Sequence, residues 1–185
     1  MVKRVILIHG WHGTPDENWF PWLKKQLEKR NVQVIVPQMP GKDWPLKEEW
    51  VAKIKEVVGK PDDETYFVGH SLACISILRY LEELDYKANI GGAVFVAGFA
   101  KSIGKEELMN FLKPEVNFEN VLVHCGNFVC IFSDNDRYVP LEISHDLQKN
   151  LEAKTILEPG NGHFGSKENM KELPAVLEEL IEMMG

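Results

Sequence analysis

Residues 65–78 read Thr-Tyr-Phe-Val-Gly-His-Ser-Leu-Ala-Cys-Ile-Ser-Ile-Leu, two apolar runs joined by a short turn of small and polar residues. The first run is typical of a buried strand, and the second is typical of a helix that starts at Ser71. The turn from Gly69 to Ala73 matches the pattern G-x-S-x-G with Ala in the last place, and its small end residues permit a sharp bend. We therefore expect Ser71 to be a nucleophile with its hydroxyl exposed at the helix N-terminus. A helix-capping serine is the alternative.

The same alternation of apolar strands and helical patterns continues along the rest of the chain. The strands are short and continuously apolar, which is typical of a parallel sheet covered by helices on both faces. Strands are expected at 4–8, 32–36, 65–68, 93–97, 128–132 and 154–157, and helices at 18–29, 46–58, 71–84, 105–112, 141–150 and 167–183. Segment 118–125 is ambiguous. No linker or repeat divides the sequence, so we expect a single α/β domain over residues 1–185.

Composition excludes several classes of function. The chain has 185 residues and a net charge of −7, whereas nucleic-acid binding usually needs a basic face. No apolar run approaches the roughly 20 residues of a membrane span. Cys74, Cys125 and Cys130 are an odd number without the spacing of a disulfide framework, which favours reduced thiols in the cytoplasm. The sequence makes no prediction about the oligomeric state.

Two polar loops follow predicted strands downstream of Ser71, in the order in which an acid and a base follow the serine in such sheets. The later loop contains His163 among glycines, whereas His145 falls in a predicted helix and His124 precedes a strand. We expect His163 to be the general base that takes the proton of the serine hydroxyl. The earlier loop contains two aspartates, Asp134 and Asp136, between which spacing alone does not choose. The other aspartate would be a turn or capping residue.

The first predicted strand ends in His9-Gly-Trp-His-Gly, a loop suited to stabilising an oxyanion. We expect its backbone amide at Trp11, or failing that at His12, to act together with the amide of Leu72. His9, His12 and His163 could suggest a metal site. However, the H-x-x-H spacing is not on a helix and no carboxylate cluster accompanies it, so no metal is expected.

Four further residues are candidates for lining a substrate pocket. They are His70, Phe99, Tyr138 and Phe164. For the three aromatic residues, a place in the core or on the surface is an equal alternative.

With these motifs in place, the sequence resembles the small, lidless α/β-hydrolases of the YdeN and retinoblastoma-binding-protein-nine group. The resemblance covers nearly the whole chain. Its carriers are Ile8-His-Gly-Trp, Trp19-Phe-Pro-Trp-Leu-Lys-Lys, Gly69-His-Ser-Leu-Ala, Val96-Ala-Gly-Phe-Ala-Lys-Ser, Ser133-Asp-Asn-Asp-Arg-Tyr-Val-Pro and Gly162-His-Phe. It implies a six-stranded parallel sheet in the order 2-1-3-4-5-6 without a cap domain. It also implies that the triad aspartate is Asp136, which precedes Val139-Pro140, and that Asp134 is the turn residue.

One property of the group does not transfer to this chain. Its name suggests binding of pocket proteins through the motif L-x-C-x-E, but Leu72-Ala-Cys-Ile-Ser lacks the glutamate and lies in the predicted core. We therefore expect no such partner.

The motifs and the resemblance together predict a serine hydrolase. It would cleave small carboxylic esters through an acyl-enzyme intermediate and would need no cofactor. A site without a cap would favour short acyl groups. The alternatives are hydrolysis of amide or peptide bonds, and a non-catalytic interaction module that retains the fold.

Overall fold

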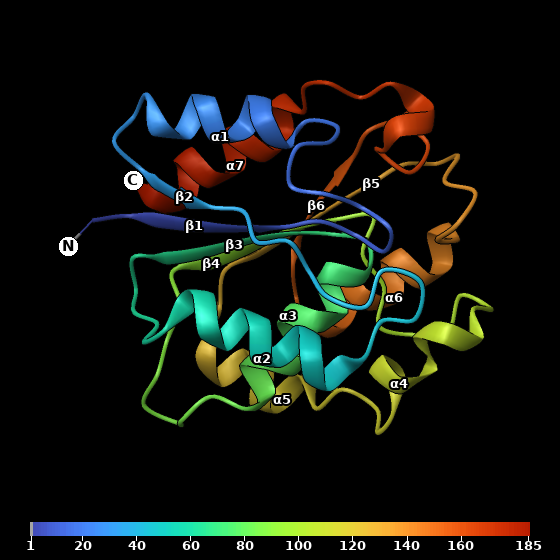
Figure 1. Cartoon of the computed structure of the whole chain (residues 1–185), viewed down its shortest axis with the longest axis horizontal. Helices are drawn as coiled ribbons and strands as arrows, with labels where there is room; N and C mark the ends of the chain where they lie inside the picture. The colour runs from blue at the N-terminus through green and yellow to red at the C-terminus, as the bar shows by residue number, and fades with distance from the viewer. Residues whose placement is uncertain (1) are drawn as a thin grey trace.

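Six strands form one parallel sheet in the computed structural model, which describes residues 2–185 (Figure 1). Their order across the sheet is β2-β1-β3-β4-β5-β6, as predicted. The strands are β1 (Arg4–Ile8), β2 (Gln33–Ile35), β3 (Thr65–His70), β4 (Gly92–Val96), β5 (Phe128–Phe132) and β6 (Lys154–Leu157). Because all six strands run in one direction, their carboxyl ends meet along one edge, and the loops that follow them lie side by side there.

Helices cover both faces of this sheet, which gives the predicted three layers (Figure 1). One face is covered by α1 (Phe20–Glu28) and α7 (Pro174–Met184). The other is covered by α2 (Lys47–Val58), α3 (Leu72–Glu82), α4 (Met109–Leu112), α5 (Phe118–His124) and α6 (Leu141–Asn150). The segment between β4 and β5 adds a 3₁₀ turn at Glu106–Leu108. Residues 2–185 form no cap domain over the sheet.

Side chains of the central strands alternate between two hydrophobic cores. Val5 and Leu7 of β1 belong to the core under α1 and α7, whereas Ile6 and Ile8 belong to the core on the α3 side. Successive strand residues point to opposite faces, so a strand covered on both sides must be apolar throughout. β6 is different, because it lies at the edge of the sheet and most of its residues are exposed.

The last predicted helix is interrupted. In place of one helix over 167–183, the chain forms a 3₁₀ turn at Ser166–Glu168 and then a helix that begins only at Pro174. Asn169 has φ = 51°, which ends the turn, and Pro174 occupies the first helical turn, where its missing N–H costs nothing. The helical pattern in the sequence continues through the break because Met170 and Leu173, which lie between the two pieces, pack in the same core as Val176 and Leu180 of α7.

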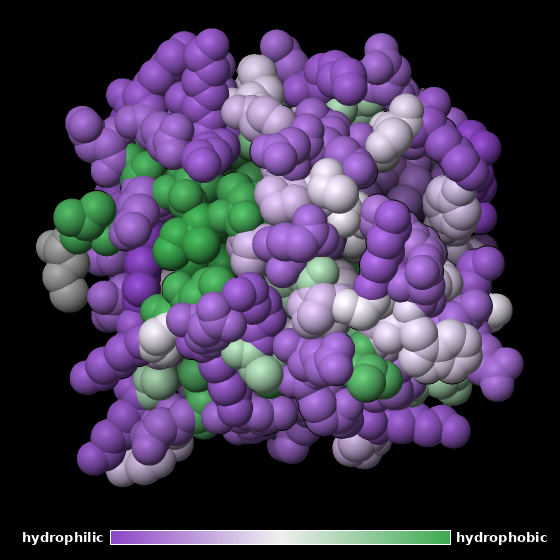
Figure 2. Space-filling model, in the orientation of Figure 1, coloured by the Kyte–Doolittle hydropathy of each residue, from purple (hydrophilic) through white to green (hydrophobic). Residues whose placement is uncertain are grey.

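The surface is largely hydrophilic in the orientation of Figure 1, apart from a band of apolar residues over the part of the sheet that holds β1 and β2 (Figure 2). Cys74, Cys125 and Cys130 are all buried and none is in a disulfide. In residues 2–185, we find no helix that is both long and apolar enough to cross a membrane.

Candidate active site

Ser71 sits in a strained turn between β3 and α3. Its φ is 56° and its ψ is −117°, a conformation that non-glycine residues rarely adopt. The Ser71 amide donates to the Val96 carbonyl of β4 at 2.9 Å, and the turn itself is closed by a hydrogen bond of 3.0 Å from the Cys74 amide to the Ser71 carbonyl. A Cβ atom at Gly69 would lie 2.8 Å from Ile77 Cδ1 and 3.1 Å from the Cys74 amide nitrogen, so this position has no room for a side chain. These contacts explain why glycine occupies position 69, two residues before the serine.

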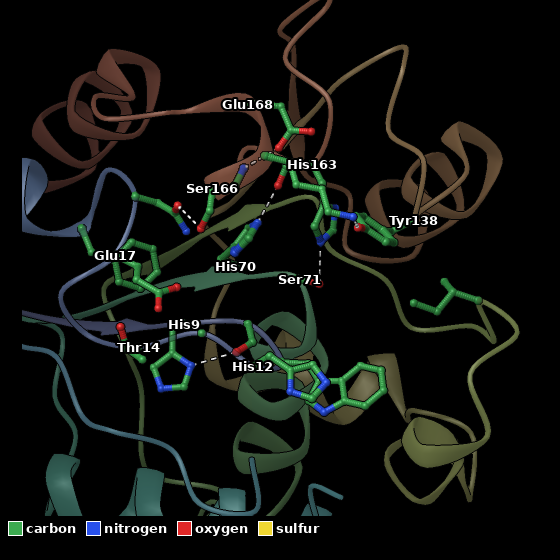
Figure 3. A pocket seen from close by; sticks show the side chains of 18 of the residues that line it. His9, His12, Thr14, Glu17, His70, Ser71, Tyr138, His163, Ser166 and Glu168 are labelled. Carbon is green, nitrogen blue, oxygen red and sulfur yellow. Dashed lines mark hydrogen bonds between the residues drawn. The ribbon is translucent and has the colours of Figure 1, made fainter. Parts of the chain in front are cut away.

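Ser71, His163 and Asp136 form a hydrogen-bonded series at the carboxyl edge of the sheet. His163 Nε2 lies 2.9 Å from Ser71 Oγ (Figure 3). His163 Nδ1 lies 2.7 Å from Asp136 Oδ2. The Asp136 side chain is only 3% exposed and that of His163 is 14% exposed, so water screens their interaction weakly. The ring of Tyr138 packs edge-on against His163, with centroids 5.0 Å apart.

The two aspartates that spacing alone does not separate, and of which the resemblance implies Asp136, make different contacts. Asp136 accepts hydrogen bonds at Oδ1 from the amides of Tyr138 (2.8 Å) and Val139 (3.1 Å), which leaves Oδ2 for His163. Asp134 turns away from the histidine ring and accepts a hydrogen bond of 2.8 Å from the Gly160 amide. Thus the structure brings Asp136, and not Asp134, to the imidazole.

Two residues beside these aspartates bind the same loop and were missed by the sequence reasoning. Asn135 Oδ1 accepts hydrogen bonds from the Gly162 amide (2.7 Å) and from the Ser133 hydroxyl (2.8 Å). Ser133 Oγ in turn accepts a hydrogen bond of 3.0 Å from the Asn161 amide. The signal that could have identified them is the uninterrupted polar run Ser-Asp-Asn-Asp directly after a buried strand. Such side chains readily bind nearby backbone amides.

Two more histidines border the site and are held neutral. His9 uses both ring nitrogens in hydrogen bonds: Nε2 accepts from the Met39 amide (3.0 Å) and Nδ1 donates to the Gly10 carbonyl (2.8 Å). Burial lowers the pKa of His9. His70 donates from Nε2 to the His163 carbonyl (2.8 Å), and burial lowers the pKa of His70 to about 3.

The histidines do not converge as a metal site would require. His12 is exposed and lies 3.7 Å from Asp43, whereas both ring nitrogens of His9 already have backbone partners. Over the described range 2–185, no three His, Cys, Asp or Glu side chains are grouped so that they could hold a metal ion.

An open cleft of about 480 Å³ lies over Ser71 and His163. Tyr138 lies on one side of Ser71, and Thr14 and Glu17 lie on the other (Figure 3). The apolar part of the lining comprises Trp11, Phe20, Ile103, Leu108 and Tyr138. The cleft therefore has both an apolar wall and a polar wall within reach of the serine.

Two of the four predicted pocket residues line this cleft and two do not. His70 and Tyr138 border it, as expected. Phe99 and Phe164 are fully buried and do not border it, so that part of the prediction is corrected. Phe99 packs into the core on the α3 side of the sheet, and Phe164 packs into the core under α1 and α7. Both follow strand ends, where sequence does not tell whether a side chain turns inward or outward.

Comparison with known proteins assigns the chain to a family. Residues 5–182 match the model of the serine hydrolase family. The chain belongs to this family. Among its relatives is YdeN of Bacillus subtilis (strain 168), which is 33% identical over 181 residues, covering 97% of this chain and 95% of YdeN. This finding confirms the predicted resemblance to the YdeN group.

Solved structures agree with the family assignment. The crystal structure of the B. subtilis ydeN gene product matches with a TM-score of 0.93 and covers 98% of each chain. Est1E from Butyrivibrio proteoclasticus matches with a TM-score of 0.77 at 18% identity, covering 99% of this chain and 88% of Est1E. This serine hydrolase thus shares its fold with a protein of only 18% identity.

Proposed function

We propose that this chain hydrolyses small carboxylic esters through an acyl-enzyme intermediate on Ser71, with His163 and Asp136 completing a catalytic triad. The observation that carries the proposal is the continuous hydrogen bonding from Ser71 Oγ through both ring nitrogens of His163 to Asp136 Oδ2, at 2.9 and 2.7 Å. A nucleophile, a base within hydrogen-bond reach and a buried group that orients the base are the three parts that this chemistry requires.

The proposed reaction has two halves. His163 Nε2 takes the proton of Ser71 Oγ as this oxygen attacks the ester carbonyl, and Asp136 stabilises the imidazolium that forms. The imidazolium then gives its proton to the leaving alcohol, which leaves the acyl group bonded to Ser71. In the second half, His163 takes a proton from water, the resulting hydroxide attacks the acyl carbonyl, and the proton returns to Ser71. The products are one acid and one alcohol, and the reaction requires no cofactor.

The amides of Leu72 and Trp11 are the proposed donors to the oxyanion. Leu72 is the first residue of α3, and amides in the first turn of a helix have no acceptor within the helix. The backbone that precedes Trp11 packs closely against the nucleophile, because a Cβ atom at Gly10 would lie 3.0 Å from Ser71 Cβ. Two amides next to the reacting oxygen would stabilise the negative charge that develops there.

The cleft supports a small substrate with an apolar acyl group. Trp11, Ile103, Leu108 and Tyr138 supply an apolar wall, and the cleft is open to solvent.

We place the activity in the cytoplasm, since three buried and unpaired cysteines suit a reducing compartment.

The test is labelling with a fluorophosphonate probe together with hydrolysis of p-nitrophenyl esters of increasing acyl length. We expect the wild-type chain to be labelled and to hydrolyse the short esters, and Ser71→Ala to do neither. If the wild-type chain hydrolyses aminoacyl amides but turns over esters poorly, the proposed activity becomes amide hydrolysis in place of ester hydrolysis. A folded wild-type protein that neither labels nor turns over any ester would refute the proposal and favour a non-catalytic module.

A further inference from the structure

The loop that carries His163 has left-handed backbone on both sides of this residue. Gly162 has φ = 52°, and Phe164 has φ = 55° although it carries a side chain. Left-handed backbone at a non-glycine residue costs free energy and persists only where the surrounding structure holds it. The position of the catalytic base therefore depends on what fixes this loop.

Contacts from the β5 side hold the part of the loop that precedes His163. The side chains of Ser133, Asp134 and Asn135 bind the amides of residues 160–162, as described above. These contacts end one residue before the base. The second part of the loop begins at His163. There the Phe164 amide donates to the Asn161 carbonyl at 3.0 Å within the loop, but the carbonyls of His163 and Phe164 bind groups outside it.

Two ring N–H groups hold that second part, from elements far away in the sequence. His70 Nε2, at the end of β3, donates to the carbonyl of His163 at 2.8 Å (Figure 3). Trp19 Nε1, just before α1, donates to the carbonyl of Phe164 at 3.1 Å. The two donor rings lie edge to face, with centroids 6.2 Å apart. Two consecutive carbonyls are thus bound by two packed rings.

We propose that His70 and Trp19 are positioning residues, which hold the backbone of residues 163–164 so that the His163 ring meets Ser71 and Asp136 at once. The proposal rests on the catalytic triad proposed above and assigns neither residue a contact with substrate. Trp19 belongs to the run Trp19-Phe-Pro-Trp-Leu-Lys-Lys and His70 lies inside the turn motif. The proposed triad uses neither side chain.

The placement of His70 suits this role. It directly precedes the nucleophile, so one stretch of backbone presents both Ser71 and the imidazole ring that binds the carbonyl of the base. Burial and the nearby His163 ring lower the pKa of His70, while Asp136 acts in the opposite direction. A neutral His70 is needed here, because a second cation 5.0 Å from the His163 ring would disfavour the imidazolium that the reaction forms.

The experiment compares His70→Leu, His70→Gln and Trp19→Phe with a matched control. Leucine fills the space of the imidazole without a donor, whereas the glutamine amide can reach the position of Nε2. His124→Leu is the control, because His124 is likewise buried and its Nδ1 donates to the carbonyl of Ala88 at 2.7 Å. His124 precedes β5, at the opposite edge of the sheet from Ser71.

We expect His70→Leu and Trp19→Phe to lower kcat on p-nitrophenyl acetate by about tenfold to a hundredfold, with KM changed less than about twofold, because a misplaced base slows chemistry and not binding. His70→Gln should recover most of the loss, and His124→Leu should keep the wild-type kcat. Wild-type kcat in His70→Leu, or an equal loss in His124→Leu, would overturn the proposal.

Proton NMR gives a second readout that does not depend on turnover. The proton between His163 Nδ1 and Asp136 should give a strongly downfield signal in the wild type and in His124→Leu, and fast exchange should erase it in His70→Leu. An unchanged signal in His70→Leu would refute the positioning role even if the ester assays succeed. If the wild type hydrolyses no ester but still shows this signal, and the signal is lost in His70→Leu, that result would refute the proposed reaction but support the positioning role.

Discussion

Asn135 Oδ1 accepts a hydrogen bond of 2.7 Å from the amide of Gly162, the residue before His163. Asn135 itself precedes Asp136, whose carboxylate binds the His163 ring. The side chains of Asn135 and Asp136 therefore bind two neighbouring residues of the histidine loop. Asn135 binds the backbone amide of the first, and Asp136 binds the imidazole ring of the second. This pairing keeps the acid and the base in register, since neither loop can shift without breaking both contacts.

Removing this amide acceptor should impair both stability and turnover. Asn135→Ala leaves the Gly162 amide without its partner, which should cost about 1–3 kcal/mol in the free energy of unfolding and lower kcat about tenfold. The control is Asn120→Ala, which removes a hydrogen bond of 2.9 Å to the Glu82 carbonyl far from the cleft. Urea denaturation and ester kinetics on both variants check this. Equal kcat losses in the two would argue against a role for Asn135 in the site.

The two aspartates should differ sharply in their effect on turnover. Asp136→Asn should lower kcat by about three to four orders of magnitude, because an amide holds the His163 ring in the wrong tautomer and does not stabilise the imidazolium. Asp134→Asn keeps an oxygen that can accept from the Gly160 amide, so it should retain kcat within about fivefold. Steady-state kinetics on one ester measures both. If Asp134→Asn lost more turnover than Asp136→Asn, Asp134 would be the triad aspartate.

Acid should destabilise the fold through His70. Burial lowers the pKa of this histidine in the folded chain from an ordinary 6.5 to about 3, and the nearby His163 and His9 rings act in the same direction. The hydrogen bond to the His163 carbonyl and the Asp136 carboxylate act against this shift. Between these pH values the unfolded chain binds a proton at His70 that the folded chain does not. The free energy of unfolding should therefore fall as the pH drops from about 6.5 towards 3.

His70→Gln isolates this contribution, because the variant cannot titrate at that position. Urea unfolding of both proteins at about pH 7 and about pH 4.5 should show a smaller decline for the variant than for the wild type. Parallel declines would mean that His70 is protonated in the folded chain, contrary to its burial.

The apolar wall of the cleft should set the acyl preference. Ile103 is half-buried on this wall. Ile103→Ala should lower kcat/KM for p-nitrophenyl hexanoate by about tenfold but leave the acetate nearly unchanged, since about 0.8 kcal/mol is at stake for each methylene that loses its contact. Val57→Ala, a half-buried apolar position outside the cleft, is the control. Equal losses on acetate and hexanoate would show that the acyl chain does not contact Ile103.

The strand order and the helix positions were largely predictable because they follow from local periodicity. Apolar runs such as residues 128–132 must be strands buried on both faces, and parallel strands require helical crossovers. The boundaries were less predictable where backbone conformation depends on a single residue. The break at Asn169 and the late start of α7 at Pro174 are examples. There the apolar pattern continues through a change in backbone direction.

The sequence by itself determined the strand–turn–helix unit around Ser71 and the order of serine, acid and histidine along the chain, because both can be recognised from short local patterns. Only the tertiary structure decided which residues meet. It brought Asp136 to His163, where spacing alone left Asp134 open and the choice of Asp136 rested on the resemblance. It buried Phe99 and Phe164 away from the cleft. It also joined His70 and Trp19 to carbonyls 93 and 145 residues away. Such contacts depend on the direction in which each loop folds back over the sheet, and no local pattern in the sequence records that direction.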